Sequence, residues 1–102
     1  MAIFLNYTPH TICLNDGREF TSIGTARVTN NFSNFVDDVC SVTYGDIIGL
    51  PAPVKDVKYI VSSMVLNAAK SIGRNDCVAP ATGHHSCVRK DGFIISVPGF
   101  VS

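Results

Sequence analysis

A chain of 102 residues is long enough for one domain with a single modest core, since folding at this length buries a little over ~60% of the extended-chain surface. Eight basic and eight acidic residues give a net charge of zero, which removes the attraction that dominates nucleic-acid binding and excludes a protein that coats DNA or RNA. Hydrophobic residues make up 46% of the chain and charged residues only 16%, so we expect apolar surface to be buried between the subunits of a homo-oligomer.

The first thirty residues predict short strands separated by turns. The expected strands are residues 2–7, 10–14, 18–23 and 25–29, with a break at Thr8-Pro9 because proline cannot donate to a ladder. In the last of them Arg27 alternates with Ala26 and Val28, so its side chain should point away from the core. The apolar run at the start is too short for a secretion signal or a membrane span, and we expect a cytosolic protein with reduced cysteines and no membrane partner.

Residues 30–38 combine turn-forming residues with Phe32, Phe35 and Val36, and we expect a flap with aromatic anchors here. A strand should follow at 39–44, and an irregular turn at 45–51 should lead back to the centre of the domain. The neighbouring Asp37 and Asp38 would point apart on a strand, so they make no convincing acid–base pair.

Residues 59–76 carry the clearest pattern of the chain. Residues 59–61 are aromatic or β-branched and indicate the end of a buried strand, after which Ser62 and Ser63 can cap a helix at about 63–72 that Gly73 ends. Free N–H groups and the positive end of the helix dipole meet at such an N-terminus, which makes it a reasonable site for a phosphate. Serine caps are common, however, so ordinary capping by itself is sufficient to explain the two serines.

The C-terminal part predicts an extended segment at 77–80, a polar loop at 81–86 and a hairpin around Asp91-Gly92. The turn should pair Lys90 with Phe93, Arg89 with Ile94 and Val88 with Ile95, leaving Arg89 on the face opposite the main apolar set. The whole chain, residues 1–102, is therefore predicted to be one α+β domain of mostly antiparallel strands with one principal helix.

Arg27 and Arg89 are thus both expected on strands with the guanidinium turned away from the core. Such arginines are often solvated or paired with a carboxylate. The alternative is an anion clamp, because the planar guanidinium donates two parallel hydrogen bonds to a phosphate. The sequence leaves both interpretations open.

Five blocks resemble, in their order, a family of small phage and prophage proteins. The family's blocks run Asn-Leu-Thr-Pro-His, Ala-Arg-Val, Tyr-Gly-Glu-Val-x-Gly-Leu-Pro, Tyr-Ile-Val-Ser and Val-Arg-Asp-x-x-Gly, and here they correspond to residues 6–10, 26–28, 44–51, 59–62 and 88–92. Tyr7 and Asp46 depart from that pattern. The family includes Thoeris anti-defence sponges, which hold cyclic ADP-ribose isomers made by bacterial TIR enzymes without cleaving them and assemble as dimers and hexamers.

The resemblance implies a phage protein that acts in the cytoplasm of the bacterial host and sequesters a cyclic nucleotide signal, with no catalytic residue, cofactor or metal. It implies that Arg27 and Arg89 contact phosphate or ribose groups, with Tyr59 and Asn67 as further contacts from the strand–helix block. His84, in the polar loop, can hydrogen-bond the same ligand. The sequence does not decide between a cyclic ADP-ribose isomer and a cyclic oligonucleotide as the ligand. It also does not decide whether the defence system that is countered is Thoeris or CBASS.

The sequence also contains features that are typical of other functions. Cys77, His84, His85 and Cys87 are four possible zinc ligands, but their spacing matches closed zinc sites poorly. A nucleotide hydrolase would use His84 or His85 as its acid–base group. A small phage protein that binds a protein partner would dock through residues 32–36. His10 is expected to be a turn residue whose ring bonds a backbone group.

Overall fold

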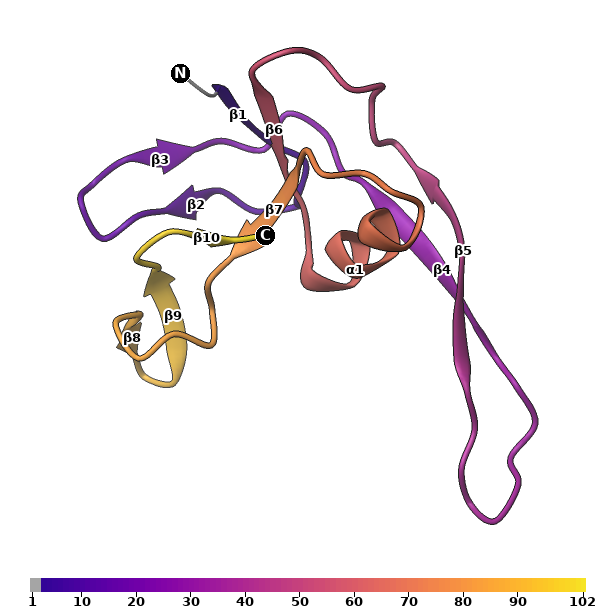
Figure 1. The fold of residues 1–102 in the computed structure, drawn as a ribbon. Helices are drawn as coiled ribbons and strands as arrows, with labels where there is room; N and C mark the ends of the chain where they lie inside the picture. The colour runs from indigo at the N-terminus through magenta and orange to yellow at the C-terminus, as the bar shows by residue number, and fades with distance from the viewer. Residues whose placement is uncertain (1–2) are drawn as a thin grey trace.

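The computed structural model describes residues 3–102, so Ala2, the first residue of the first predicted strand, lies outside the described part. Figure 1 shows a small central sheet, one helix packed on it and three hairpins that extend from it. The predicted α+β class, mostly strands with one principal helix, is confirmed. The elements are β1 (Ile3–Asn6), β2 (Ile12–Cys13), β3 (Glu19–Phe20), β4 (Arg27–Phe32), β5 (Val42–Ile48), β6 (Val57–Ile60), α1 (Ser63–Ser71), β7 (Cys77–Pro80), β8 (Val88–Lys90), β9 (Phe93–Ser96) and β10 (Phe100–Val101).

The central sheet has the strand order β1-β6-β7-β10. β1, β6 and β7 are parallel, and β10 closes the sheet as an antiparallel edge strand. Helix α1 connects β6 to β7, which is how neighbouring parallel strands are usually joined. The other strands pair as antiparallel hairpins, β2–β3, β4–β5 and β8–β9. The parallel pairing at the centre is the part of the topology that the sequence patterns did not predict.

Helix α1 begins and ends close to the predicted positions. Ser62 is the N-cap, and its Oγ accepts a hydrogen bond from the Val65 N–H at 3.3 Å. Gly73, at φ 86°, is the left-handed residue that ends the helix. Two apolar residues at the start and the end of this segment, Met64 and Ile72, are exposed. The buried helix residues are Val65, Leu66, Ala68 and Ala69.

The β4–β5 hairpin is longer than the sequence predicts, and the expected turn at residues 45–48 is wrong. β5 runs through Gly45 because that glycine lies at a bulge opposite β4 and not at a turn. A Cβ at position 45 would collide with the Thr29 hydroxyl, so the close approach of the two strands requires glycine. The chain turns at Gly49 instead, at φ 85°.

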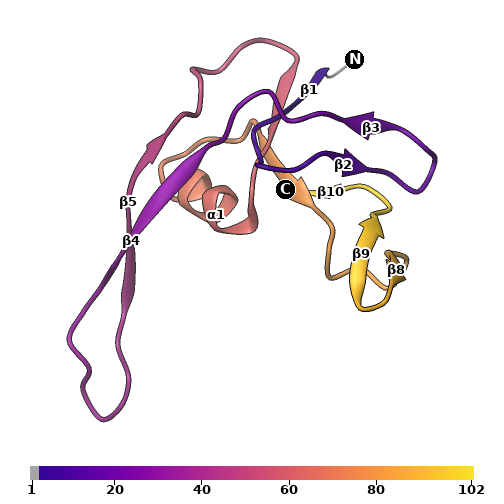
Figure 2. The same ribbon diagram turned by 180° about the vertical axis from the view of Figure 1, so that it is seen from behind.

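Residues 30–38, expected to form a flap, are the outer part of this hairpin. Val36 and Val39 pair across a tight turn in which Asp37 and Asp38 have φ values of 51° and 65°. Two consecutive positive φ values are typical of the turn that closes a two-residue hairpin loop. Figures 1 and 2 show that the hairpin projects well away from the sheet and helix. We call residues 27–48 the arm.

The β8–β9 hairpin confirms most of the predicted register. Asp91 and Gly92 both have positive φ, and the pairs of Lys90 with Phe93 and of Arg89 with Ile94 are present. The third predicted pair is wrong, because the register shifts after Arg89 and Val88 pairs with Ser96 instead of Ile95. A bulge of this kind places two residues of one strand opposite one of the other, which a turn-based register cannot foresee.

The core is small and lies between α1 and the central sheet. Its most completely buried members come from β6 and its C-terminal end, and from the facing side of α1; Ile60, Val61, Ala69 and Ala79 have no measurable exposure. Within residues 3–102 the only helix is far too short and polar to cross a membrane. The four cysteines are free thiols.

Candidate functional site

A groove of about 430 Å³ lies where the N-terminus of α1 meets the base of β4. Three separate segments line it: the turn after β1, the start of β4 and the first turn of the helix. The side chains that give the groove its chemistry are Tyr7, Thr8, Pro9, Arg27, Ser62 and Met64.

The turn after β1 is held rigidly by Asn6, which is 2% exposed. The Asn6 side chain donates to the carbonyls of His10 and Phe20 at 2.8 and 2.7 Å, and its Oδ1 accepts from the N–H and hydroxyl of Thr8 at 2.9 and 2.6 Å. All of its hydrogen-bonding groups are used, so the turn that carries Thr8 and Pro9 into the groove has a fixed shape. The His10 carbonyl accepts hydrogen bonds from the side chains of Asn6 and Thr8, whereas the predicted bond from the His10 ring to a backbone group is not found among the described residues.

Tyr7 forms the floor between this turn and β4. Its N–H donates to the Ile60 carbonyl at 2.8 Å, and its carbonyl accepts from the Ala26 N–H at 2.9 Å. The ring lies edge-on to Tyr59, with centroids 5.5 Å apart. A Cβ on Gly24 would come within 2.8 Å of the Tyr7 ring, so glycine is needed there for the ring to lie flat against the chain. Tyr7, the residue after β1, therefore joins the groove directly to the core.

Arg27 is the cation of the groove. It is the first residue of β4 and is exposed, whereas its neighbour Ala26 is 5% exposed, so the predicted orientation away from the core is confirmed. The ion pairs found among the described residues are Arg18 with Asp16 and Arg74 with Asp76, and Arg27 is in neither. Its guanidinium is free to bind an anion.

The N-terminus of α1 supplies further anion-binding groups to the same groove. Ser63 and Met64 are the first helical residues, and N–H groups at these positions have no intrahelical acceptor. The helix dipole adds a partial positive charge at this end. The structure thus brings together two features that the sequence identified separately, the serine-capped helix start and Arg27.

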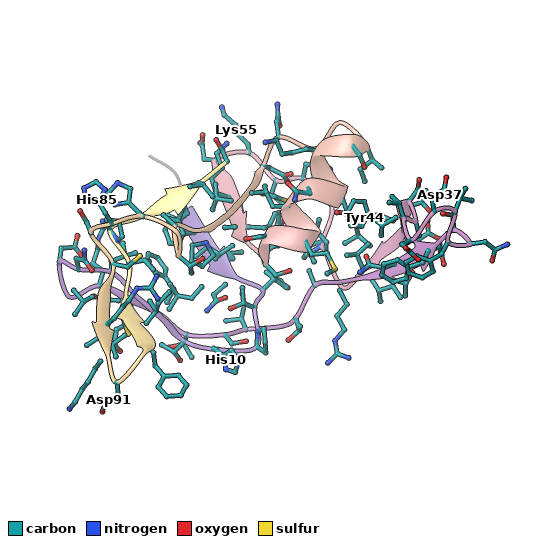
Figure 3. All side chains as sticks on the ribbon, turned by 90° about the horizontal axis from the view of Figure 1, so that it is seen from below. His10, Asp37, Tyr44, Lys55, His85 and Asp91 are labelled. Atoms are coloured by element: carbon teal, nitrogen blue, oxygen red, sulfur yellow. The ribbon has the colours of Figure 1, made fainter. Side chains whose placement is uncertain are left out.

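Arg89 lies elsewhere. It is on β8, is exposed, and donates through Nη2 to the Thr82 carbonyl at 3.2 Å. Figure 3 shows Asp91, at the tip of this hairpin, and Asp37, at the tip of the arm, at opposite ends of the molecule. Arg89 does not line the groove that holds Arg27. A clamp made by both arginines is not formed within one chain.

The other predicted contacts are divided between the core and the surface. Tyr59 is 2% exposed and its hydroxyl donates to the Ala52 carbonyl at 3.0 Å, so it belongs to the core and its assignment as a ligand contact is corrected. Asn67 is exposed on α1 but outside the groove. His84 lines a smaller hollow of about 240 Å³ that also includes Ser63 and Thr82.

His84 is exposed, and its ring stacks on that of His85 with centroids 4.3 Å apart. Its Nδ1 accepts a hydrogen bond from the Ser86 N–H at 3.0 Å, which leaves Nε2 facing outward as the second ring nitrogen. Ser62 lies in the groove and Ser63 in this hollow, so the start of α1 separates the two. Sequence reasoning missed Tyr7, Thr8, Pro9 and Met64, since only the fold brings them to the helix start.

The strongly perturbed titratable groups lie at the other end of α1. Hydrogen bonds from Arg74 at 2.7 and 2.9 Å hold the pKa of Asp76 below its ordinary value. Burial raises the pKa of the Cys77 thiol to about 11, so the thiol is protonated at neutral pH and is a poor nucleophile. Arg74 also donates to the Pro51 carbonyl at 3.0 Å. These groups tie a loop to the helix end.

Across residues 3–102 no three His, Cys, Asp or Glu side chains gather in a way that could hold a metal ion. The chain matches no protein-family model, and neither curated proteins nor solved structures give a significant match. The groove is therefore the feature of the molecule that best indicates a function.

Proposed function

We propose that the chain is a phage-encoded sponge that binds a cyclic nucleotide signal in the groove and holds it without cleaving it, which would suppress an anti-phage defence in the bacterial cytoplasm. The single observation that carries the proposal is that Arg27 and the N-terminus of α1 line one groove. A guanidinium and free backbone N–H groups are the two donors best suited to phosphate oxygens. The resemblance to phage anti-defence proteins supplies the class of ligand.

The rest of the groove suits the non-phosphate parts of such a ligand. Tyr7, Pro9 and Met64 offer apolar surface to a base, and the hydroxyls of Thr8 and Ser62 can bond ribose oxygens. The groove is also large enough for part of a nucleotide but open to water along one side. Nanomolar binding corresponds to about −12 kcal/mol, which is a large demand on an open site of one small domain.

A second chain that covers the open side would exclude water and add contacts. We therefore propose that the active form is a homo-oligomer, a dimer or a hexamer. Arg89, Asn67 and His84 then stay proposed ligand contacts, acting from the neighbouring hollow or from another subunit. His84 is a binding group in this proposal and has no catalytic role.

The test is to incubate the purified protein with cyclic ADP-ribose isomers and cyclic oligonucleotides, remove free ligand, denature the protein and identify the released molecule by mass spectrometry. Release of an intact cyclic nucleotide in near-stoichiometric amount supports the sponge. A converted product would instead indicate the hydrolase that uses His84 or His85. Absence of any bound nucleotide would contradict the proposal.

The groove is tested by Arg27→Gln, which keeps a polar side chain and its aliphatic stem but is two atoms shorter than arginine and has no charge. Loss of charge-assisted hydrogen bonds should weaken binding roughly 10- to 100-fold, measured by calorimetry. Arg18→Gln is the matched control, because Arg18 is an exposed arginine paired with Asp16 outside the groove. If Arg27→Gln binds as well as Arg18→Gln, the ligand lies elsewhere; His84→Gln then tests the second hollow, and Arg89→Gln tests the β8–β9 hairpin.

A further inference from the structure

Helix α1 covers one face of the arm at its base. Toward the tip, no other described element covers that face. Cross-strand partners share a face, so the pairs Val28 with Ile47, Asn30 with Tyr44 and Phe32 with Val42 follow one another along it. Val28 and Ile47 pack against the core beneath α1. Phe32 is 67% exposed.

The tip beyond β4 and β5 is apolar as well. Phe35, Val36 and Val39 are 72%, 70% and 68% exposed, more than most apolar residues of a folded chain. A two-stranded hairpin has little stability by itself in water. The outer arm thus carries several large apolar side chains that its own chain leaves in solvent. We call Phe32, Phe35, Val36, Val39, Val42 and Tyr44 the arm patch.

The size of the molecule leads to the same conclusion. The radius of gyration is 15.1 Å, against about 13 Å for a compact domain of this length. The accessible surface is 6829 Å², where a compact monomer of this mass has about 5,600 Å². The excess of roughly 1,200 Å², to which the arm and the two other projecting hairpins contribute together, is of the order of the about 800 Å² that one partner contributes to a standard interface.

Charge limits what can cover the arm patch. Between Val28 and Gly45 the only charged residues are Asp37 and Asp38, and there is no lysine, arginine or histidine. A nucleic acid or an anionic membrane surface needs basic side chains, so neither is a suitable occupant. The six residues of the arm patch are uncharged, so the patch can lie against a copy of itself without bringing like charges together. Such a self-complementary surface is what a two-fold dimer requires.

We propose that the arm patch is the surface through which two copies of this chain dimerise, with the arms antiparallel about a two-fold axis. The antiparallel arrangement places the two Asp37-Asp38 tips at opposite ends of the interface. A parallel arrangement would bring four carboxylates together, and like charges in contact are unfavourable. The inference names the surface of the proposed oligomer but does not depend on which ligand the groove binds.

The test measures molar mass by light scattering during size-exclusion chromatography, without ligand, over a range of loading concentrations. The wild type should have a mass of about twice, or an even multiple of, the 10.9 kDa chain. Phe32→Ser should shift the protein toward monomer, with a dissociation constant raised at least tenfold. A wild type that is monomeric at every concentration would overturn the proposal.

The matched control is Phe93→Ser, since Phe93 is 75% exposed on the β8–β9 hairpin, outside the arm. It should dimerise like the wild type. Phe35→Ser is a second arm variant, and circular dichroism verifies that each variant is folded. A dimer that survives both arm variants, or that only Phe93→Ser disrupts, would place the interface elsewhere. Arg27→Gln should bind ligand poorly yet dimerise normally, so failure of one proposal can be told from failure of the other.

Discussion

The β6–α1–β7 unit and the arm are both rich in apolar residues, yet one is buried and the other is in solvent. Ile60 and Val61 have no measurable exposure, whereas Phe35 and Val36 are about 70% exposed. The unit buries its apolar residues because parallel strands are covered on both faces by elements of the same chain. The outer part of the arm extends past the end of α1, so the residues of the arm patch are not covered by another described element of their own chain. Hydrophobic content indicates that a segment will be buried, but not whether its own chain can do so.

This difference predicts that two aromatic truncations have very different effects on the stability of the monomer. Tyr59→Ala should lower the free energy of unfolding by about 3–5 kcal/mol, because it leaves a cavity in the core and an unpaired Ala52 carbonyl. Phe35→Ala should leave the stability of the diluted monomer nearly unchanged and reduce stability only where the protein dimerises. Urea unfolding at two protein concentrations measures both. A concentration-independent loss for Phe35→Ala would mean that the arm packs within its own chain.

A smaller effect is expected from the ion pair that anchors the unit. Asp76 is 8% exposed, and breaking its pair leaves the partly buried Arg74 without its carboxylate, so Asp76→Asn should destabilise the protein by about 1–3 kcal/mol at neutral pH. The pKa of Asp76 is lowered in the folded state, so its contribution is complete above the unfolded value near ~4 and is lost as the pH falls through the folded value.

Urea unfolding between neutral pH and strongly acidic pH tests this sign. The wild type should lose part of its stability below about pH 4, and Asp76→Asn should lack that part. Asp16→Asn is the control, since Asp16 and Arg18 form an exposed pair in a hairpin turn and such pairs contribute little. Equal losses for the two variants would mean that the Asp76 pair is no stronger than a surface pair.

The same two regions show how far the sequence could be interpreted. The helix, its serine cap and the Gly73 stop were predictable because capping and glycine chemistry are local. The extent of β5 was not predictable. A glycine such as Gly45 usually indicates a turn, but here glycine is required because Thr29, a residue distant in sequence, lies close to it. The exposure of the arm could not be predicted from the alternation of apolar and polar residues. A strand shows the same alternation whether or not another element covers its apolar face.

The groove shows the same limit. Arg27 and the helix start were each identified from local pattern, and the structure brings them to one groove. Tyr59 was named as a ligand contact only from the resemblance, and its burial in the core argues against that contact. The contribution of Thr8 and Pro9 depends on the turn that Asn6 fixes, whose hydrogen bonds reach as far as Phe20.

The smallest predicted effect concerns the helix start, where the buried unit and the groove meet. Ser62→Ala removes the hydroxyl that accepts from the Val65 N–H and should cost about 1 kcal/mol of unfolding free energy. Ser63→Ala, one residue later, should cost almost nothing, because among the described residues the Ser63 hydroxyl has no hydrogen-bond partner and alanine is a better helix former. Because Ser62 also lines the groove, its variant should weaken nucleotide binding several-fold at unchanged dimerisation. Thermal unfolding and calorimetry on the pair of variants measure both effects; equal behaviour of the two would show that neither the cap nor the groove depends on the Ser62 hydroxyl.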